Sequence, residues 1–272
     1  MSDHDALLAA VLADPDSDLP RLVFADHLDE SGHPADAARA QFIRLQIEAA
    51  RLLESARDDA ITLHRAARAL EGHCRDEVDL VMPPEEYGAY MVMRRRGFAH
   101  QLWTGSNDLE RLGSQLFAVA PIRSVTLTSF LGSNDWLEHA DYLGRVEELS
   151  IAPVPLQRPT YPGNGPPQEH DADYRPLVET AHLTCLQQLY LIQNRLDNNW
   201  LVWFARAFTR TSFANSLRVL DLSGNYLTDA GASVLVAASG FDRLNQVVLA
   251  GTYFTPHGVG LLRRRFGERV RF

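Results

Sequence analysis

Cysteine is scarce in this chain: only Cys74 and Cys185 occur among its 272 residues. Two cysteines far apart in the sequence cannot build the dense disulfide framework of small secreted proteins, and they leave no paired spacing for a cysteine-rich zinc module. We therefore expect both to be reduced thiols. With 46% hydrophobic and 22% charged residues, the composition is that of an ordinary globular protein with enough apolar side chains for one large or two medium domains.

Long uncharged runs are also missing. None reaches the roughly 18 residues that a membrane-spanning helix needs. The first twenty residues carry Asp3, Asp5 and Asp14 around a short apolar stretch, without the basic leader and small-residue cleavage site of a signal peptide. We therefore expect a cytoplasmic protein with no membrane partner.

Positive charge is in deficit, with 26 Lys and Arg against 35 Asp and Glu and a formal net charge of −9. This balance repels nucleic acids and anionic membranes unless a local basic patch overrides it, so we expect no nucleic-acid partner. Two short basic patches occur, Arg94–Arg96 and Arg263–Arg265. We interpret each as a solvated surface or as a helix end, where carbonyl groups favour cations.

Motifs for catalysis and cofactor binding are absent. The ten histidines show no zinc-protease spacing, and no phosphate loop, dinucleotide fingerprint or nucleophile elbow occurs. We therefore expect no metal, no cofactor and no enzymatic activity. Cys74, beside His73, is the candidate nucleophile of an alternative function, an effector-type enzyme that uses a thiol. Adjacent helical side chains diverge, so we prefer a half-buried helix thiol.

The segment LRVLDLSGNYL, residues 217–227, carries the main pattern of the chain. It places Leu217, Leu220, Leu222, Asn225 and Leu227 at the spacing Leu-x-x-Leu-x-Leu-x-x-Asn-x-Leu. Alternate side chains of a strand face the same way, so the two central leucines point inward together. The Asn side chain can satisfy backbone groups left open where the strand ends. The pattern resembles a leucine-rich repeat.

Four further copies of this pattern occur. The first residues of all five lie at positions 122, 146, 186, 217 and 244, at intervals of 24, 40, 31 and 27. Three intervals match or nearly match the period of leucine-rich repeats, and the fourth contains an insertion. A sixth, weaker copy lies in GFAHQLWTG, where either Leu102 or Trp103 can be the inward residue.

Between the strands the apolar spacing changes to that of short amphipathic helices, which end near Gly240 and Gly267. Alternating strands and helices resemble the ribonuclease-inhibitor-like class of these repeats. One strand and helix cannot bury their own apolar face, so neighbouring units must stack, and residues 268–272 are expected to form a C-terminal cap strand. We predict an α/β fold: a short leucine-rich-repeat solenoid over residues 91–272, with parallel strands concave and helices convex.

The longest interval contains a proline-rich insertion, residues 153–176, with seven of the fourteen prolines of the chain. Proline disrupts both helices and strand ladders, so we predict an exposed loop. An inert insertion is the preferred interpretation. A polyproline ligand is one alternative, and another is that a bacterial protease cleaves the chain here.

Residues 1–90 have helical periodicity instead. Apolar residues from Leu7 to Leu12 share one helical face, a second helix begins near Asp18 and ends at Gly32, and a third begins at Pro34. These residues are predicted to form a small all-helical domain and a connecting helix in front of the repeats.

Part of this region resembles the bacterial repeat-companion domain, which precedes leucine-rich repeats in some bacteria. The resemblance covers about residues 5–50. It implies an architecture and no catalytic residue. The chain departs from the family at His27, where an aromatic residue is usual, and at Gln41, where an acidic one is usual. The matching residues are RLVFAD at 21–26, LDE at 28–30, Gly32, Pro34 and FIRLQ at 42–46.

Asp26 and Arg44 lie on helices that we expect to be adjacent. A pair of charges near the core margin needs mutual compensation, so we expect an ion pair that fixes the helix packing. On this view Asp26→Ala should destabilise the fold.

The outward strand positions and the residues that follow the Asn position form the candidate binding surface. Solenoids use such uncovered parallel strands for protein recognition, and aromatic, aliphatic and Arg side chains are favoured at binding hot spots. We therefore predict a non-enzymatic scaffold that binds a protein partner on the concave face and ascending edge of the repeats. The predicted protein-binding residues are Tyr190, Ile192, Arg195, Asp221, Tyr226, Val248 and Tyr253.

Overall fold

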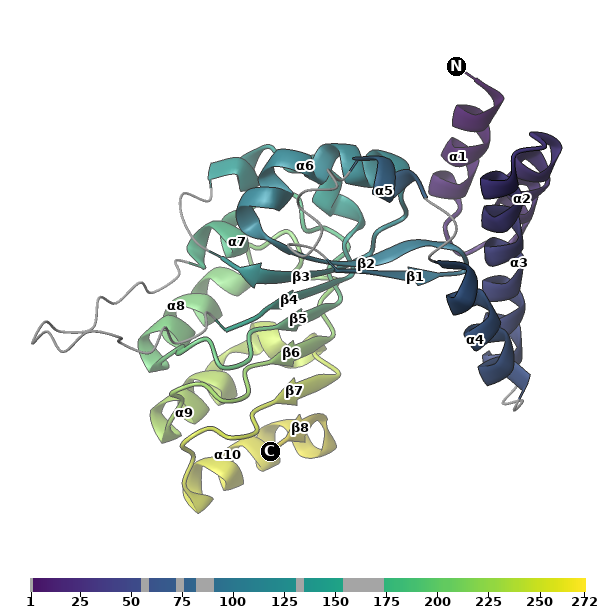
Figure 1. The fold of residues 1–272 in the computed structure, drawn as a ribbon. Coiled ribbons are helices and arrows are strands. Elements are labelled where there is room, and N and C mark those ends of the chain that lie inside the picture. The colour runs from purple at the N-terminus through teal and green to yellow at the C-terminus, as the bar shows by residue number, and fades with distance from the viewer. Residues whose placement is uncertain (1, 55–58, 72–75, 82–90, 131–134, 154–173) are drawn as a thin grey trace, which may run out of the picture. The chain divides into compact units, whose positions relative to one another are not determined.

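The computed structural model describes residues 2–54, 59–71, 76–81, 91–130, 135–153 and 174–272 of the chain (Figure 1). It divides into two compact units, which are Met1–Leu102 with Leu112–Arg123 (unit 1) and Trp103–Arg111 with Ser124–Phe272 (unit 2). Cys74 and residues 154–173 of the proline-rich insertion lie outside the described residues. The predictions about that thiol and that loop therefore stay predictions.

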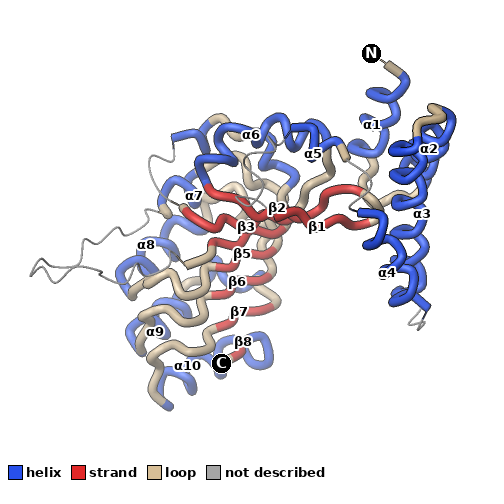
Figure 2. Tube along the Cα trace, viewed as in Figure 1, coloured by secondary structure: helices blue, strands red, loops and turns tan. Residues whose placement is uncertain are grey.

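Every described element of unit 1 before residue 82 is a helix (Figure 2). The first helix begins with a capping box, in which the Ser2 hydroxyl accepts from Asp5 N and the Asp5 carboxylate accepts from Ser2 N. The core of unit 1 includes the fully buried side chains of Phe24, Ile43 and Phe98. The elements are α1 (Asp3–Ala13), α2 (Leu19–Glu30), α3 (Pro34–Glu54), α4 (Asp59–Glu71), α5 (Glu77–Val81), β1 (Met91–Arg95), the first part of β2 (Phe98–Gly105) and the last part of α6 (Ser106–Val119).

The turn between β1 and β2 packs directly on α3. Arg96 and Gly97 both have positive φ, 52° and 86°, as in tight hairpin turns. A Cβ at position 97 would lie 2.6 Å from Ile43 Cγ1, so no larger residue fits there. The Gln46 side-chain oxygen accepts a hydrogen bond from Gly97 N at 2.7 Å. The hairpin is thus attached to α3 by both shape and hydrogen bonding.

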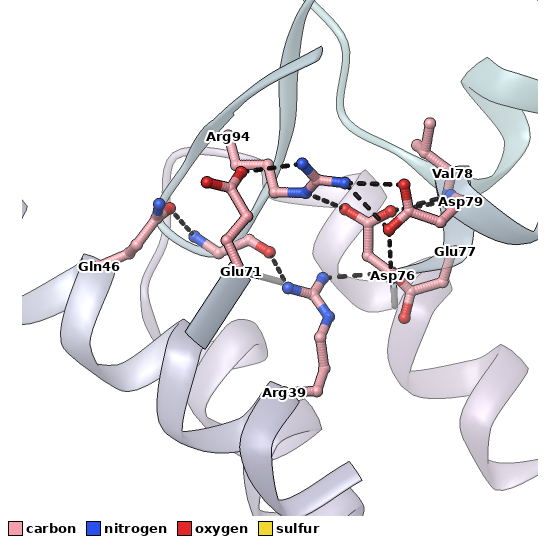
Figure 3. Close-up of polar contacts among 9 residues, drawn as sticks. Arg39, Gln46, Glu71, Asp76, Glu77, Val78, Asp79 and Arg94 are labelled. Atoms are coloured by element: carbon pink, nitrogen blue, oxygen red, sulfur yellow. Dashed lines mark hydrogen bonds and ion pairs between the residues drawn. The ribbon is translucent and has the colours of Figure 1, made fainter. Parts of the chain in front are cut away.

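A buried ionic network surrounds Arg94 on β1 (Figure 3). Its guanidinium contacts Asp76 at 2.5 Å, Glu71 at 3.0 Å and Asp79 at 3.1 Å, and only 11% of the side chain is exposed. The interpretation of Arg94–Arg96 as a solvated patch is therefore wrong for Arg94. A strand position that faces three carboxylates holds its charge inside the unit, which periodicity does not reveal.

Arg39 of α3 is a second buried arginine, 3% exposed, beside this network. It donates to the Gly97 carbonyl and pairs with Glu77 at 3.3 Å. Its guanidinium also lies 5.0 Å from the centre of the Phe98 ring, where a cation is attracted to the ring face. One side chain thus links α3, α5 and the β1–β2 hairpin.

The expected ion pair between Asp26 and Arg44 is present at 2.6 Å, and Arg44 also contacts Asp29 at 2.6 Å. Both contacts are solvated, because 67% of the Asp26 side chain and 38% of the Arg44 side chain are exposed. The expectation that this pair lies at the core margin is wrong. Solvent screening limits what an exposed pair contributes.

Replacing Arg94 should therefore destabilise unit 1 much more than replacing Asp26. Arg94→Ala leaves the buried Asp76 without its ion-pair partner, which we expect to lower the free energy of unfolding by about 3–5 kcal/mol. Asp26→Ala, the matched control, should cost at most about 1 kcal/mol. Urea unfolding followed by circular dichroism measures both, and equal losses would contradict the assignment.

The same network predicts an acid-dependent stability. Burial alone would raise the pKa of Asp76, but the hydrogen bond from Arg94 and the charges of Arg39 and Arg94 outweigh it, so the pKa lies below its ordinary value of 3.8. The unfolded chain therefore binds more protons near that pH, and stability falls as the pH drops through the folded-state pKa. Asp76→Asn should flatten this dependence between about pH 4 and 2 in urea titrations. An unchanged slope would contradict the assignment.

The strands of unit 2 follow one another across the sheet in chain order. Those from β3 to β8 pair in parallel, and helices α7 to α10 stack in sequence beside them (Figure 1). The parallel α/β arrangement predicted from the sequence is confirmed for these strands. The elements are β3 (Ser124–Ser129), η2 (Asp135–Glu138), η3 (Asp141–Arg145), β4 (Glu148–Ile151), α7 (Arg175–Glu179), β5 (Gln188–Tyr190), α8 (Asn198–Phe208), β6 (Val219–Asp221), α9 (Asp229–Ala237), η4 (Ser239–Arg243), β7 (Gln246–Val248), α10 (Pro256–Phe266), η5 (Gly267–Arg269) and β8 (Val270–Arg271).

The apolar strand positions align from one strand to the next. Leu189, Leu220 and Val247 are register partners, and each is 0% exposed. In β2 the buried residue is Leu102, also 0% exposed, whereas Trp103 is partly exposed. Leu102 is therefore the inward residue of β2, the strand of the sixth, weaker copy of the pattern.

Asn225 is fully buried in the turn that follows β6, and its side chain joins this turn to the equivalent turn after β5. Its oxygen accepts from the backbone N–H groups of Asn194 and Leu196, each at 3.0 Å. Its amide nitrogen donates to the carbonyls of Leu191 at 2.7 Å and Leu222 at 2.8 Å. The predicted role of this side chain in satisfying open backbone groups is thus visible in its bonds.

The two flanking positions repeat this arrangement in part. Asn194 donates to the Ile151 carbonyl at 2.9 Å and accepts from the Tyr174 hydroxyl at 2.7 Å. Thr252, which replaces Asn in the last copy, donates to the Leu249 carbonyl at 2.7 Å. Among the described residues, Asn225 therefore makes more side-chain hydrogen bonds to the neighbouring copy than Thr252 does.

Asn225→Ala should leave several buried backbone groups without partners, at about 1–3 kcal/mol each. We expect a total loss of about 3 kcal/mol or more in the free energy of unfolding. Thr252→Ala, at the equivalent position, should cost about 0.5–1.5 kcal/mol. Denaturant titration of the tryptophan fluorescence measures both, and a loss at Asn225 no larger than that at Thr252 would refute the role given to the amide.

Candidate protein-binding surface

One row of outward side chains crosses the sheet of unit 2. Parallel pairing places Tyr190 next to Asp221 and Asp221 next to Val248, so three predicted binding residues lie side by side. Thr126 and Ser150 extend the row at one end and Arg271 at the other. Arg271 is not among the predicted binding residues, although an inward Val270 implies an outward Arg271.

The row is less accessible than its sequence pattern suggests. Asp221 is 9% exposed, and its carboxylate accepts a hydrogen bond from Ser223 N at 2.8 Å. Tyr190 is partly exposed, and its hydroxyl donates to the Gln188 side chain at 2.6 Å. Burial, followed by the charges of Glu148 and Asp221, raises the pKa of Tyr190. Asp221 thus stabilises its own turn, whereas the neutral Tyr190 phenol faces outward.

A more exposed edge follows the ends of the strands. Tyr226 is 50% exposed and Tyr253 61%, and their ring centres lie 6.0 Å apart. Arg195 occupies the equivalent position one unit earlier and is exposed, and within the described residues no hydrogen bond or ion pair holds its guanidinium. Ile192 is partly exposed before it. We call Arg195, Tyr226 and Tyr253 the aromatic edge.

Backbone hydrogen bonds beneath the aromatic edge join each copy of the strand pattern to the preceding copy. Tyr226 N donates to the Leu196 carbonyl at 2.9 Å, and Tyr253 N donates to the Leu227 carbonyl at 2.8 Å. These bonds fix the backbone positions from which the two rings project. A binding surface with an ordered backbone would lose little backbone entropy on association.

The helix side of unit 2 contains a hollow that sequence reasoning did not single out. It lies along α7, α8 and the residues that follow α8, so no single periodic segment of the sequence marks it. Its lining mixes apolar, cationic and acidic side chains. The lining includes Val178, Glu179, Trp203, Arg206, Arg210 and Thr211.

Metal centres and reactive thiols are two further kinds of site to consider in the described part of the chain. No group of three or more His, Cys, Asp or Glu side chains there could hold a metal ion. Cys185 is an exposed free thiol. No helix among the described residues combines the length and the apolar character needed to cross a bilayer.

The chain matches no protein-family model and no curated protein. Among solved structures it is similar to a protein from Bacteroides fragilis determined by a structural genomics consortium, with 16% sequence identity and a TM-score of 0.40. The match covers 55% of this chain and 40% of the other. The resemblance to the repeat-companion domain is thus not supported by a family match.

Proposed function

We propose that the chain is a non-enzymatic interaction protein, in which a short leucine-rich-repeat arc binds a protein partner and a helical module precedes it. Two features support the repeat assignment: the repeated sequence pattern and the in-register parallel strands that carry it. The hydrogen bonds of Asn225 between adjacent units are a third. Together they correspond to a stack in which each unit covers the apolar face of its neighbour.

The observation that carries the binding proposal is the aromatic edge. Tyr226 and Tyr253 are large and half or more exposed, and the backbone beneath them is hydrogen-bonded to the preceding units. Tyrosine and arginine are the side chains that most often dominate protein interfaces. These two rings contribute little buried area to the stack, because half or more of each is exposed. A role in recognition therefore accounts for them better than a role in stability.

Site-specific photo-cross-linking tests this proposal. A benzophenone side chain in place of Tyr226 or Tyr253 should capture one and the same protein in cells, whereas the same probe at Arg264, exposed on α10, should not. The double variant Tyr226→Ser/Tyr253→Ser should then bind the captured partner at least about tenfold more weakly, with an unchanged melting temperature. Equal capture from position 264, or undiminished affinity, would contradict the proposal.

A further inference from the structure

Unit 1 contains a small pocket lined mainly by cationic side chains. Arg21 comes from α2, Arg95 from the end of β1 and Arg96 from the hairpin turn, while His100 comes from β2 and Arg123 directly precedes β3. Asp16, in the loop between α1 and α2, is the only carboxylate among the lining residues. The cavity itself is only about 10 Å³, and the surrounding space between these side chains, about 250 Å³ in all, opens to solvent. Four guanidinium groups thus converge in a chain whose net charge is −9.

Arg21 is the buried member of this group, with 3% of its surface exposed. One of its terminal nitrogens donates to the Ser17 carbonyl at 2.8 Å, but its Nε is buried and has no hydrogen-bond partner among the residues that the structure describes. Burial and the charge of Arg96 lower the pKa of Arg21 to about 10. A buried donor without an acceptor, next to like charges, costs free energy that an anion would recover.

The remaining groups of the pocket point to the same ligand charge. Arg123 pairs with Asp16 at 3.2 Å, and Arg96 lies 3.5 Å from Asp18, so the loop between α1 and α2 holds these two guanidinium groups in place. Burial, followed by the charges of Arg95, Arg123 and Arg21, lowers the pKa of His100 to about 4, although Asp16 opposes this. At neutral pH the imidazole is uncharged and can exchange hydrogen bonds with a ligand.

We propose that this pocket binds a small phosphate-type oxyanion, either free phosphate or a phosphate monoester. Planar guanidinium groups match the geometry of phosphate oxygens, and several of them concentrate positive potential in a partly enclosed space. The small volume favours a compact anion over a nucleotide. This site lies within unit 1 and is independent of the aromatic edge and its partner.

Titration of the full chain with inorganic phosphate at constant ionic strength, by isothermal calorimetry, tests the proposal. The wild type should bind with a dissociation constant of millimolar or tighter, and Arg95→Gln/Arg123→Gln should bind at least tenfold more weakly. Arg263→Gln/Arg264→Gln, which removes two exposed arginines of α10, should match the wild type. Arg95→Gln alone, at an exposed position, keeps the test valid if the double variant does not fold.

Two further titrants identify the source of the anion. Tighter binding of phosphoserine than of inorganic phosphate would assign a monoester, and the reverse would assign free phosphate. Acetate binding as tight as phosphate binding would overturn the proposal, as would no heat in the wild type or equal weakening in the Arg263/Arg264 pair.

A second readout follows the imidazole in the pocket. Bound phosphate should raise the pKa of His100 from about 4, because an adjacent negative charge favours the imidazolium form. The ring C–H resonances report this in NMR titrations with and without phosphate, and the exposed His257 is the control. A His100 pKa that does not respond to phosphate would overturn the proposal.

Discussion

Backbone groups that are left open where a buried strand ends must find hydrogen-bond partners, and in unit 2 the side chain of Asn225 meets this requirement. Its amide bonds to two N–H groups of the preceding unit and to carbonyls on both sides of the gap. Since such groups are costly to leave unpaired, each copy of the strand pattern depends on the neighbouring copy. The in-register parallel pairing of the strands around β6 follows from this dependence together with the buried leucines.

The position of the candidate binding surface follows from the same constraint. Tyr226 and Tyr253 directly follow Asn225 and Thr252 at equivalent places in successive copies of the pattern, and both tyrosine side chains are exposed. A substitution at either of these exposed positions leaves the packing of the core unchanged. The proposed binding residues and the residues that stabilise the stack are therefore adjacent but different, so exposed aromatic rings can be accommodated here without cost to the core.

Periodicity was sufficient to predict the features that repeat. The inward leucines, the parallel order of the strands and the role of Asn225 follow from local spacing, since every copy obeys the same rule. Features that depend on a single long-range contact were not predictable. Arg94 reads as part of a basic run, yet it faces Asp76, and Asp221 reads as an outward strand position, yet it accepts from Ser223 N. The cationic pocket was also missed, because Arg21, Arg96 and Arg123 are far apart in the sequence.

Native-state hydrogen exchange tests most directly whether neighbouring copies of the strand pattern in unit 2 depend on one another. The N–H groups of Asn194 and Leu196 donate hydrogen bonds to the Asn225 side chain. They should exchange as slowly as the N–H group of Leu191, which donates to the Asp221 carbonyl of the next strand. All three should open only with the whole of unit 2. Exchange of Asn194 and Leu196 through local fluctuations, orders of magnitude faster than Leu191, would show that the units are not joined in this way.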